Sequence, residues 1–509
     1  MRLSAGCIIG AAILAATGAV AQAVVEENGL RRSGDREAAI EHRPPLTPTE
    51  VLASEPHARV IVELRDPRIT ESNPSSANNR QAIADLQSEV LSVAIPGRRA
   101  RALSDDPRYG LRLMSTVPAF AITVDRAELE RLQSDPRVLN ISSSLKLRTQ
   151  LDQSTKLIGM KQAWAAPYKA QGAKYSVAII DEGVNLKHKF LENTRIIAQA
   201  CFSGGGDPEL SFCPNGKTKQ TGGKSGKNCP KEYDCDHGTH VAGIAAGYNT
   251  DRLSGEPKRG VARKAKIIAV QVFSKDEDPD DFETVAYTED MLAALDWLYR
   301  KRDTFDRPLA AINMSIGNDF PFTENCDDDE DFAGPIFKKV IDQLRSANIA
   351  TVISSGNEGF RNAVNFPACI STAVTVGAST KKADGQREQI AYYSNIGQVA
   401  DLLAPGGDYF YPEDVGFSTQ ILSSVLGNKF EAQQGTSMAA PHVAGLWAAI
   451  RSVKGCGGES VDAILKALKK TGKKIPDAYY AKKRANVPKA LDRLGCATAA
   501  QASVSARLQ

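Results

Sequence analysis

The chain has 509 residues, of which 42% are hydrophobic and 24% are charged, and its formal net charge at pH 7 is +3. This balance is typical of soluble globular proteins, and the length suggests two to four domains. A net charge this small favours neither a nucleic-acid partner nor attachment to a membrane surface. Function therefore has to be sought in local motifs rather than in composition.

The first 23 residues have the organisation of a secretory signal peptide. Arg2 supplies a positive start, and an apolar stretch rich in small residues runs from residue 8 to residue 20. Ala19, Ala21 and Ala23 provide two candidate cleavage sites of the small-x-small type. The apolar stretch is short for a membrane span, and no later segment has about 18 uninterrupted apolar residues. We therefore expect a secreted protein, extracellular or periplasmic, with no membrane partner after the signal is removed.

The cysteines agree with export, because eight remain once Cys7 leaves with the signal peptide, and an even number favours disulfide bonds. The eight are Cys201, Cys213, Cys229, Cys235, Cys326, Cys369, Cys456 and Cys496. We expect Cys326 to pair with Cys369, Cys456 with Cys496, and the first four among themselves. A metal site is the alternative for these four, although they lack the paired C-x2-C spacing of zinc ribbons.

Two segments precede the main part of the chain. Residues 24–57 are polar, contain Arg43-Pro44-Pro45 and show little periodicity, which predicts a flexible leader. Residues 58–149 are expected to form a small α+β domain in which two helices pack on a sheet. Its strands are expected at 59–64, 119–124 and 138–141, and its helices at 81–91 and 126–133.

From residue 150 to residue 496 the pattern changes to strands that alternate with helices. Mostly apolar strands are expected at 175–180, 266–273, 310–314 and 349–353, and helices at 240–246, 288–299 and 337–346. Near-continuous apolar strands separated by helices indicate the α/β class, with a parallel sheet covered on both faces. Residues 497–509 are expected to be an unstructured tail.

Three motifs, in the chain order Asp, His, Ser, offer an acid, a base and a nucleophile. Asp181 ends a buried strand, His237 opens the turn His237-Gly238-Thr239-His240, and Ser437 follows Gly435-Thr436 at the start of an apolar helix. A serine hydroxyl needs an adjacent base to take its proton, and that base needs a buried acid to hold its tautomer. Each residue alone also has a structural explanation: a turn aspartate, a structural or metal-binding histidine, and a capping serine. His240 and His442 lie inside their helices, and we interpret both as structural.

A fourth motif, Ser354-Ser355-Gly356-Asn357, follows a strand and presents Asn357 at a glycine turn. Its side-chain amide can donate a hydrogen bond to the oxyanion that forms when a serine attacks a carbonyl group. The free N–H groups at the start of the Ser437 helix form a second set of donors. Alone, the Gly-Asn pair would be interpreted as a turn.

Together the four motifs resemble the subtilisin-like serine protease (subtilase) family over about residues 155–490. The resemblance implies that Asp181, His237 and Ser437 are the catalytic triad and that Asn357 completes an oxyanion hole with the Ser437 N–H. It also implies a three-layer α/β fold, in which a seven-stranded, mostly parallel sheet lies between helices. Residues 58–149, through Val117-Pro118-Ala119-Phe120 and the segment after it, resemble the family's inhibitory propeptide, which the enzyme would cut off near residues 142–151.

The resemblance further implies a primary substrate pocket with two walls. Ser315-Ile316-Gly317 lines one wall and pairs with the substrate backbone, Ser354-Ser355-Gly356 lines the other, and Asn365 approaches the floor. None of these residues is charged, which favours a neutral, apolar substrate side chain before the cut. The acidic segments 275–281 and 327–331 are consistent with recognition of basic substrate residues, with structural calcium or with solvated loops. The chemistry requires no cofactor, and no spacing identifies a metal site.

The chain departs from the family pattern in two places. Glu182 follows Asp181 where the family usually has a small Ser or Thr, and a carboxylate there would raise the pKa of His237 or shape the leaving-group side. A cysteine-rich insertion over residues 202–234 precedes His237, and we expect a disulfide-pinned loop near the cleft.

The leading hypothesis is a secreted, monomeric serine endopeptidase that acts through an acyl-enzyme on protein or peptide substrates. It would be made as a self-processing zymogen, with its own propeptide as intramolecular inhibitor. The alternatives are a non-catalytic binding protein on the same fold and a peptide ligase or cyclase, in which an amine resolves the acyl-enzyme.

Overall fold

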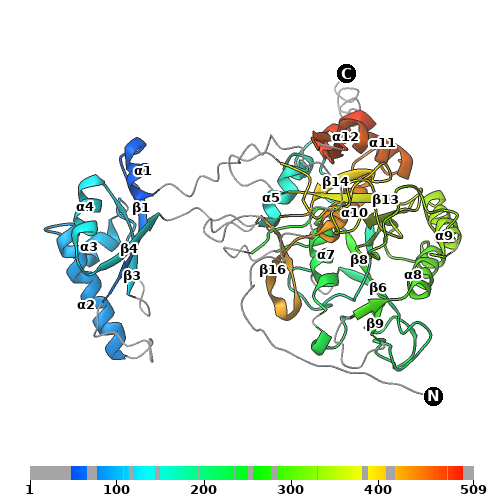
Figure 1. Ribbon diagram of the computed structural model, residues 1–509, viewed down its shortest axis with the longest axis horizontal. Helices are drawn as coiled ribbons and strands as arrows, with labels where there is room; N and C mark the ends of the chain where they lie inside the picture. Colours follow the sequence, from blue (N-terminus) through cyan, green and yellow to red (C-terminus); the bar gives the residue numbers. More distant parts are fainter. Residues whose placement is uncertain are drawn as a thin grey trace, which may run out of the picture. The chain divides into compact units, whose positions relative to one another are not determined.

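The structure is a computed structural model that describes residues 47–65, 77–106, 108–113, 118–143, 150–191, 195–233, 235–249, 256–276, 284–329, 331–380, 388–408, 419–477 and 480–496. The chain divides into two compact units, Met1–Ser144 and Leu145–Gln509 (Figure 1). The expected signal peptide, the first part of the leader and the C-terminal tail lie outside the described residues. Within the described ranges, none of the helices combines the length and apolar character that crossing a membrane requires.

The first unit contains an antiparallel sheet with the strand order β2-β3-β1-β4. Its strands are β1 (Ala58–Leu64), β2 (Arg112–Leu113), β3 (Ala119–Val124) and β4 (Val138–Ser143), and its helices are α1 (Pro48–Ser54), α2 (Ala77–Ala94), α3 (Ala100–Asp105) and α4 (Arg126–Ser134). Alternate residues of β1, Val60 and Val62, are fully buried and join Leu86 and Val90 of α2 in one apolar cluster. This is the α+β arrangement expected from the sequence, with β2 and α3 as unexpected additions.

The expectation of a flexible leader over residues 24–57 is wrong for its last part, where helix α1 forms. Thr47 caps this helix, because its hydroxyl accepts from Glu50 N while the Glu50 carboxylate accepts from Thr47 N at 2.8 Å. Pro48 occupies the first helical turn, where no N–H donor is needed, and Leu52 is buried against the unit's core. The sequence Thr-Pro-Thr-Glu carries this start signal.

The second unit is built on a sheet that, among the described residues, has ten strands in the order β17-β18-β14-β13-β12-β11-β5-β8-β6-β7. The strands are β5 (Ser176–Asp181), β6 (Ile196–Phe202), β7 (Lys219–Thr221), β8 (Lys266–Gln271), β11 (Leu309–Met314), β12 (Ala350–Ser354), β13 (Val374–Ser379), β14 (Leu402–Pro405), β17 (Lys473–Ile475) and β18 (Lys482–Arg484). The seven strands from β14 to β6 are parallel to one another, as the resemblance implied. The short strands β7, β18 and β17 extend this sheet at its two edges.

Helices cover both faces of the sheet, which gives three layers. They are α5 (Gln150–Leu157), α6 (Met160–Ala163), α7 (His237–Ala246), α8 (Thr288–Lys301), α9 (Gly334–Ser346), α10 (Thr436–Arg451), α11 (Val461–Thr471) and α12 (Val487–Leu494). In β5, Val177 and Ile179 share an apolar cluster with α7 and α10, whereas Ala178 and Ile180 share one with α8 and α9 (Figure 1). A strand buried on both faces is apolar at every position, which explains the continuous apolar run in the sequence.

Two short hairpins complete the second unit. They are formed by β9 (Phe273–Lys275) with β10 (Thr284–Ala286), and by β15 (Ile421–Ser424) with β16 (Phe430–Gln433). The expected strand 266–273 is therefore two elements, β8 and β9, because the chain leaves the main sheet after Gln271. The β15–β16 hairpin leads directly into α10.

Four disulfide bonds confirm the expected pairing. Cys326 is bonded to Cys369 and Cys456 to Cys496, while the first four cysteines form the pairs Cys201–Cys213 and Cys229–Cys235. All four cysteines of the crowded 201–235 segment are thus used in disulfides. The metal-site alternative for these cysteines is wrong.

Candidate active site

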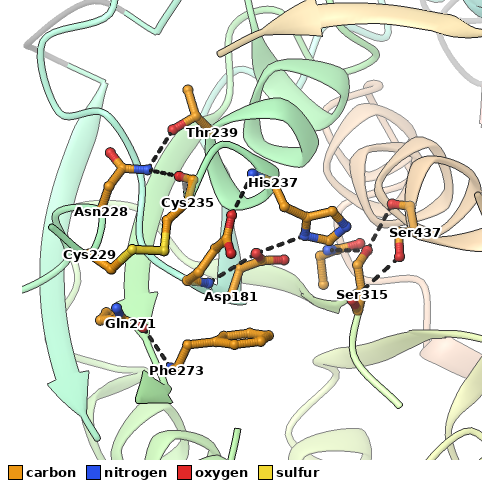
Figure 2. A network of polar contacts seen from close by, with 12 residues as sticks. Asp181, Asn228, Cys229, Cys235, His237, Thr239, Gln271, Phe273, Ser315 and Ser437 are labelled. Carbon is orange, nitrogen blue, oxygen red and sulfur yellow. Dashed lines mark hydrogen bonds and ion pairs between the residues drawn. A yellow bond between two sulfur atoms is a disulfide. The ribbon is translucent and has the colours of Figure 1, made fainter. Parts of the chain in front are cut away.

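Asp181 and His237 meet where the end of β5 faces the start of α7. Asp181 is the last residue of β5 and is fully buried, and its Oδ1 lies 2.9 Å from His237 Nδ1 (Figure 2). The same oxygen accepts the Glu182 N–H at 2.9 Å. Glycine at position 238 allows this approach, because a Cβ there would lie 2.1 Å from the Gly183 carbonyl oxygen. The structure therefore brings the predicted acid and base together through a hydrogen bond between the buried Asp181 and the partly exposed His237.

The charges around His237 favour its protonated form. Burial alone would lower its pKa, but the charge of Asp181, the hydrogen bond to Asp181 and the charge of Glu182 raise the pKa of His237 to about 9. The side chain is 31% exposed, so one part of the ring faces the open side of the site. Because Nδ1 is bonded to Asp181, Nε2 is the nitrogen that remains available to a reacting group.

Ser437 lies in the first turn of α10. Figure 2 shows the ring of His237 directed toward the side of the site on which Ser437 lies. The Ser437 hydroxyl donates a long hydrogen bond of 3.5 Å to the Ser315 carbonyl oxygen. Conversely, the Ser315 hydroxyl donates to the Ser437 carbonyl oxygen at 2.8 Å, and Asn313 Nδ2 donates to Ser315 Oγ at 3.0 Å. The nucleophile candidate is thus held through its backbone, and its hydroxyl contacts the Ser315 carbonyl oxygen rather than His237.

Asn357 stands beside the start of α10, on the turn after β12. Its Oδ1 accepts from Thr436 N at 2.8 Å and from Thr436 Oγ1 at 2.9 Å. Because Oδ1 accepts both of these hydrogen bonds, the Nδ2 donor of Asn357 points away from Thr436. Asn357 is exposed. The turn depends on Gly356, which has φ +107° and where a Cβ would lie 2.3 Å from Asn395 Nδ2. Thr436 is a functional neighbour that the sequence reasoning missed, although it stands inside the Ser437 motif.

The residues predicted to line the substrate pocket lie close together at the ends of two neighbouring strands. Ser315-Ile316-Gly317 follows β11, and Ser354-Ser355-Gly356 closes β12. Asn365 lies between the two segments: its Nδ2 donates to the carbonyl oxygen of Asn318, the residue after the first segment, and its N–H donates to the Ser355 carbonyl oxygen of the second at 3.0 Å. Asn365 is buried, with 2% of its surface exposed.

A carboxylate missing from the predicted pocket also reaches this cluster. Glu358 Oε2 accepts from Asn365 Nδ2 at 2.8 Å and from Asn395 Nδ2 at 2.6 Å. The predicted set contained no charge, so Glu358 changes its electrostatics. Its position directly after Asn357 was visible in the sequence, but the direction of its side chain was not.

Comparison with known proteins assigns the family. The model of the subtilase family matches residues 172–484, which is more than half of the chain. The chain belongs to the subtilase family. This is the family of subtilisin-like serine proteases, and the residues matched include every one of the site residues described above.

The region that matches this subtilase spans a different fraction of each relative's length. Subtilisin NAT of Bacillus subtilis subsp. natto is 28% identical over 370 residues, which are 72% of this chain and 78% of that protein. Minor extracellular protease Epr of Bacillus subtilis (strain 168) is 24% identical over 359 residues, or 66% of this chain, and the match spans only 43% of Epr. A solved protease structure from Pseudoalteromonas arctica PAMC 21717 matches with a TM-score of 0.50 and 24% identity, over 66% of this chain and 94% of that one. At this identity the structural likeness speaks for the fold alone.

The cysteine-rich insertion of this subtilase packs directly on the Asp181–His237 side of the site. Val184 N donates to the Gly226 carbonyl oxygen at 2.9 Å, just after the Asp181 turn. Asn228 Nδ2 donates to the Cys235 carbonyl oxygen at 2.7 Å and to Thr239 Oγ1 at 2.9 Å (Figure 2). The insertion is therefore part of the support of α7.

His240 and His442 are both fully buried, as their interpretation as structural residues requires. His240 Nε2 contacts the Glu431 carbonyl oxygen at 3.1 Å, and burial lowers the pKa of His240 to about 3. His442 contacts the Met438 carbonyl oxygen and Ser154 Oγ, each at 2.8 Å, and burial lowers its pKa to about 4. Both side chains are therefore neutral at neutral pH.

The acidic segments offer little to a calcium ion where they are described. Within the described ranges, no three His, Cys, Asp or Glu side chains are grouped as metal ligands would be. Asp327 instead accepts from Ser371 N at 2.8 Å and from Ser371 Oγ at 2.6 Å. Most of the other acidic segment, residues 277–281, lies outside the described residues. Structural calcium therefore stays a prediction from the sequence.

Proposed function

We propose that this subtilase is a secreted serine endopeptidase that is made as a zymogen and removes its own propeptide. The observation that carries the proposal is the hydrogen-bonded pair of buried Asp181 and partly exposed His237, which shares one site with Ser437 and the oriented amide of Asn357. This arrangement supports acyl transfer, because each chemical requirement of a serine nucleophile has a candidate at hydrogen-bonding range or one side-chain rotation away.

The proposed reaction begins when neutral His237 takes the proton of the Ser437 hydroxyl through Nε2. The Ser437 oxygen then bonds to the substrate carbonyl carbon, and Asn357 Nδ2 and the Ser437 N–H donate to the resulting oxyanion. The C–N bond breaks as His237 returns the proton to the leaving amine, which leaves an acyl-enzyme. Water then repeats the sequence and frees Ser437. Every proton moves between His237 and a reacting group, so no cofactor and no metal ion takes part.

We assign protein and peptide substrates to the site because its two walls suit an extended chain. Ser315-Ile316-Gly317 continues from a strand end and would pair with substrate backbone. Five of the six wall residues are small and none is charged, which supports a neutral, apolar side chain before the cut, although the Glu358 carboxylate is hydrogen-bonded to Asn365. We further propose a monomer, for which the site is complete within one chain.

The first unit is proposed to act as the intramolecular inhibitor and folding aid. It forms its own sheet and apolar core, and it contains none of the four site residues. Proposed cleavage near residues 142–151 would separate it from the second unit. Four disulfide bonds support export into an oxidising compartment, as the N-terminal sequence predicts.

The test compares export and processing of the wild type, Ser437→Ala and the matched control Ser346→Ala, an exposed serine on α9. Mass spectrometry of the secreted chains should show that wild type and Ser346→Ala lose the segment before about residue 150 while Ser437→Ala keeps it. Purified wild type should also cleave a protein substrate, and this cleavage should stop after treatment with a serine-directed sulfonyl fluoride.

Peptide products separate the alternatives. Hydrolysis adds one water to the two fragments, whereas a ligase or cyclase joins a fragment to an amine and a binding protein leaves the peptide intact. Processing of Ser437→Ala like the wild type, together with no cleavage of any added substrate, would overturn the proposed function.

A further inference from the structure

Glu182 is a second carboxylate beside the Asp181–His237 pair, and it contacts the backbone of His237. It follows Asp181 directly, and only 8% of its surface is exposed. Its Oε1 accepts the backbone N–H of His237 at 2.5 Å. The Gly238 N–H also stabilises this carboxylate in its charged form. Glu182, the residue just after β5, therefore reaches with its side chain to the first turn of the helix that carries His237.

This contact replaces the usual cap of α7. Asp236 stands at the N-cap position, but its side chain makes no cap hydrogen bond there. Its Oδ1 instead accepts from Leu426 N at 2.6 Å, in the β15–β16 turn. The first N–H groups of a helix lack partners within the helix, and they and the helix dipole favour an anion. The carboxylate of Glu182, the residue just after β5, thus supplies the anchor that the residue before α7 does not.

We propose that Glu182 is a positioning residue that anchors the first turn of α7 and, through its negative charge beside His237, sets the pH range in which the Asp181–His237 pair works. This inference rests on the proposed function, since it concerns how the same histidine acts as a base. It adds a residue that the triad and oxyanion-hole assignments do not include.

The charges that face Glu182 come from few groups among the described residues. Asp181 lies beside it on β5 and His237 faces it from α7, with Asp236 just before that helix. From β8 comes the neutral Gln271, which forms a backbone bridge with Glu182, and the insertion contributes the backbone of Lys227, next to Gly183. The opposite charge that stabilises the Glu182 carboxylate is thus the His237 imidazolium, which also faces Asp181.

The sign of the effect follows from this arrangement. Burial and the charge of Asp181 raise the pKa of Glu182 to about 7, so Glu182 becomes charged as the pH rises through neutrality. Once charged, it stabilises the protonated form of His237, whose pKa stands at about 9. Only neutral His237 can accept the Ser437 proton, so activity should rise as the pH approaches this value. Removing the Glu182 charge should move that rise to lower pH.

The experiment measures kcat and KM of mature enzyme on a short neutral peptide ester from pH 5 to pH 10.5. Glu182→Gln keeps an oxygen that can accept the His237 N–H but removes the charge, whereas Glu182→Ala removes both. Glu232→Gln, an exposed carboxylate in the insertion, is the matched control for the loss of one charge. Glu182→Thr provides a second uncharged variant in case Glu182→Gln does not fold.

We expect Glu182→Gln to shift the acid limb of the kcat/KM profile to lower pH by about one unit. At a fixed pH well below the wild-type limb, kcat/KM of this variant should therefore be about tenfold higher than that of wild type. The plateau should fall about twofold in Glu182→Gln and about tenfold in Glu182→Ala, mainly in kcat, because only the latter loses the anchor. Glu232→Gln should keep the wild-type limb.

Two outcomes would overturn the inference. In the first, Glu182→Gln and Glu182→Thr keep the wild-type limb. In the second, every Glu182 variant loses activity evenly at all pH values, as a purely structural residue would. Wild type that cleaves no peptide at any pH would instead overturn the proposed function, so the two failures are distinguishable.

Discussion

Asp181 and His237 form one side of the candidate site and Ser437 and Asn357 the other, and different contacts hold the two sides. On the first side, the Asp181 carboxylate is hydrogen-bonded to the His237 imidazole and the Glu182 carboxylate to the His237 backbone N–H, so charge dominates. On the second side, neutral hydroxyl, amide and backbone groups hold Ser437 and Asn357. The first side should therefore respond to pH and charge, and the second to small changes in shape and hydrogen bonding.

The two sides also differ in what remains to be assembled. The Asp181–His237 hydrogen bond is already formed at 2.9 Å, whereas the Ser437 hydroxyl still points to the Ser315 carbonyl oxygen. The acid–base pair forms as the chain folds, because burying the Asp181 carboxylate without a hydrogen-bond partner would cost free energy. Rotation of a half-buried hydroxyl held by one long hydrogen bond costs little, so the nucleophile can be aligned when substrate binds.

The largest expected effect comes from a substitution on the charged side of the site, which contains Asp181 and His237. Asp181→Asn should lower kcat by about 10⁴-fold, because an amide at this position no longer holds the productive tautomer of His237 or stabilises its charged form. Steady-state kinetics on a peptide substrate measure the change. Asp303→Asn, whose side chain is 79% exposed, is the control and should match wild type. A loss below tenfold for Asp181→Asn would contradict the role assigned to Asp181.

The next effect tests the neutral side. Asn357→Ala should lower kcat by about 10²–10³-fold with little change in KM, because the lost donor acts on the oxyanion rather than on bound substrate. The exposed Asn362→Ala is the matched control. A rise in KM at unchanged kcat would move Asn357 from the oxyanion hole to ground-state binding.

A smaller effect should come from Thr436, which orients Asn357. Thr436→Val removes the hydroxyl donor at 2.9 Å but keeps the backbone donor at 2.8 Å, so we expect about a tenfold loss in kcat. If Thr436 acts through Asn357, the same substitution in an Asn357→Ala background should have almost no further effect. Additive losses in the double variant would show that Thr436 acts on its own.

The last effect concerns stability rather than activity and samples both sides, with His240 on α7 and His442 on α10. Burial lowers both pKa values, to about 3 and about 4, so the neutral forms stabilise the fold above the unfolded value near 6.5. As the pH falls below 6.5 the unfolded chain binds protons that the folded chain does not, and stability drops. Each histidine should contribute about 1.4 kcal/mol per pH unit in this range.

Thermal unfolding of Ser437→Ala, chosen to avoid self-digestion, measures this slope between pH 7 and pH 4.5. The Tm should fall by several degrees, and adding His442→Gln should flatten the fall while lowering the Tm at pH 7. An equally steep fall in His240→Gln and His442→Gln variants would assign the acid sensitivity to other groups.

The sequence by itself determined the elements whose signal is local. Strand β5 was predicted within one residue, because a strand buried on both faces is apolar throughout. The four motifs that place Asp181, His237, Asn357 and Ser437 at strand ends and helix starts were equally readable, since such turns need glycine and small residues. Helix α1 was missed although its capping box is local, because the surrounding leader is polar and rich in proline.

Only the tertiary structure decided which side chains meet across the site. Glu182 and His237 are 55 positions apart, and Asn357 and Thr436 are 79 positions apart. Nothing in a local pattern states that Glu182 turns toward α7 or that Glu358 turns toward Asn365. The direction of such side chains depends on how β5, α7, β12 and α10 pack, and packing is set by contacts distant in the sequence. The sequence therefore carried the chemical groups of the site, and folding decided which charges each group faces.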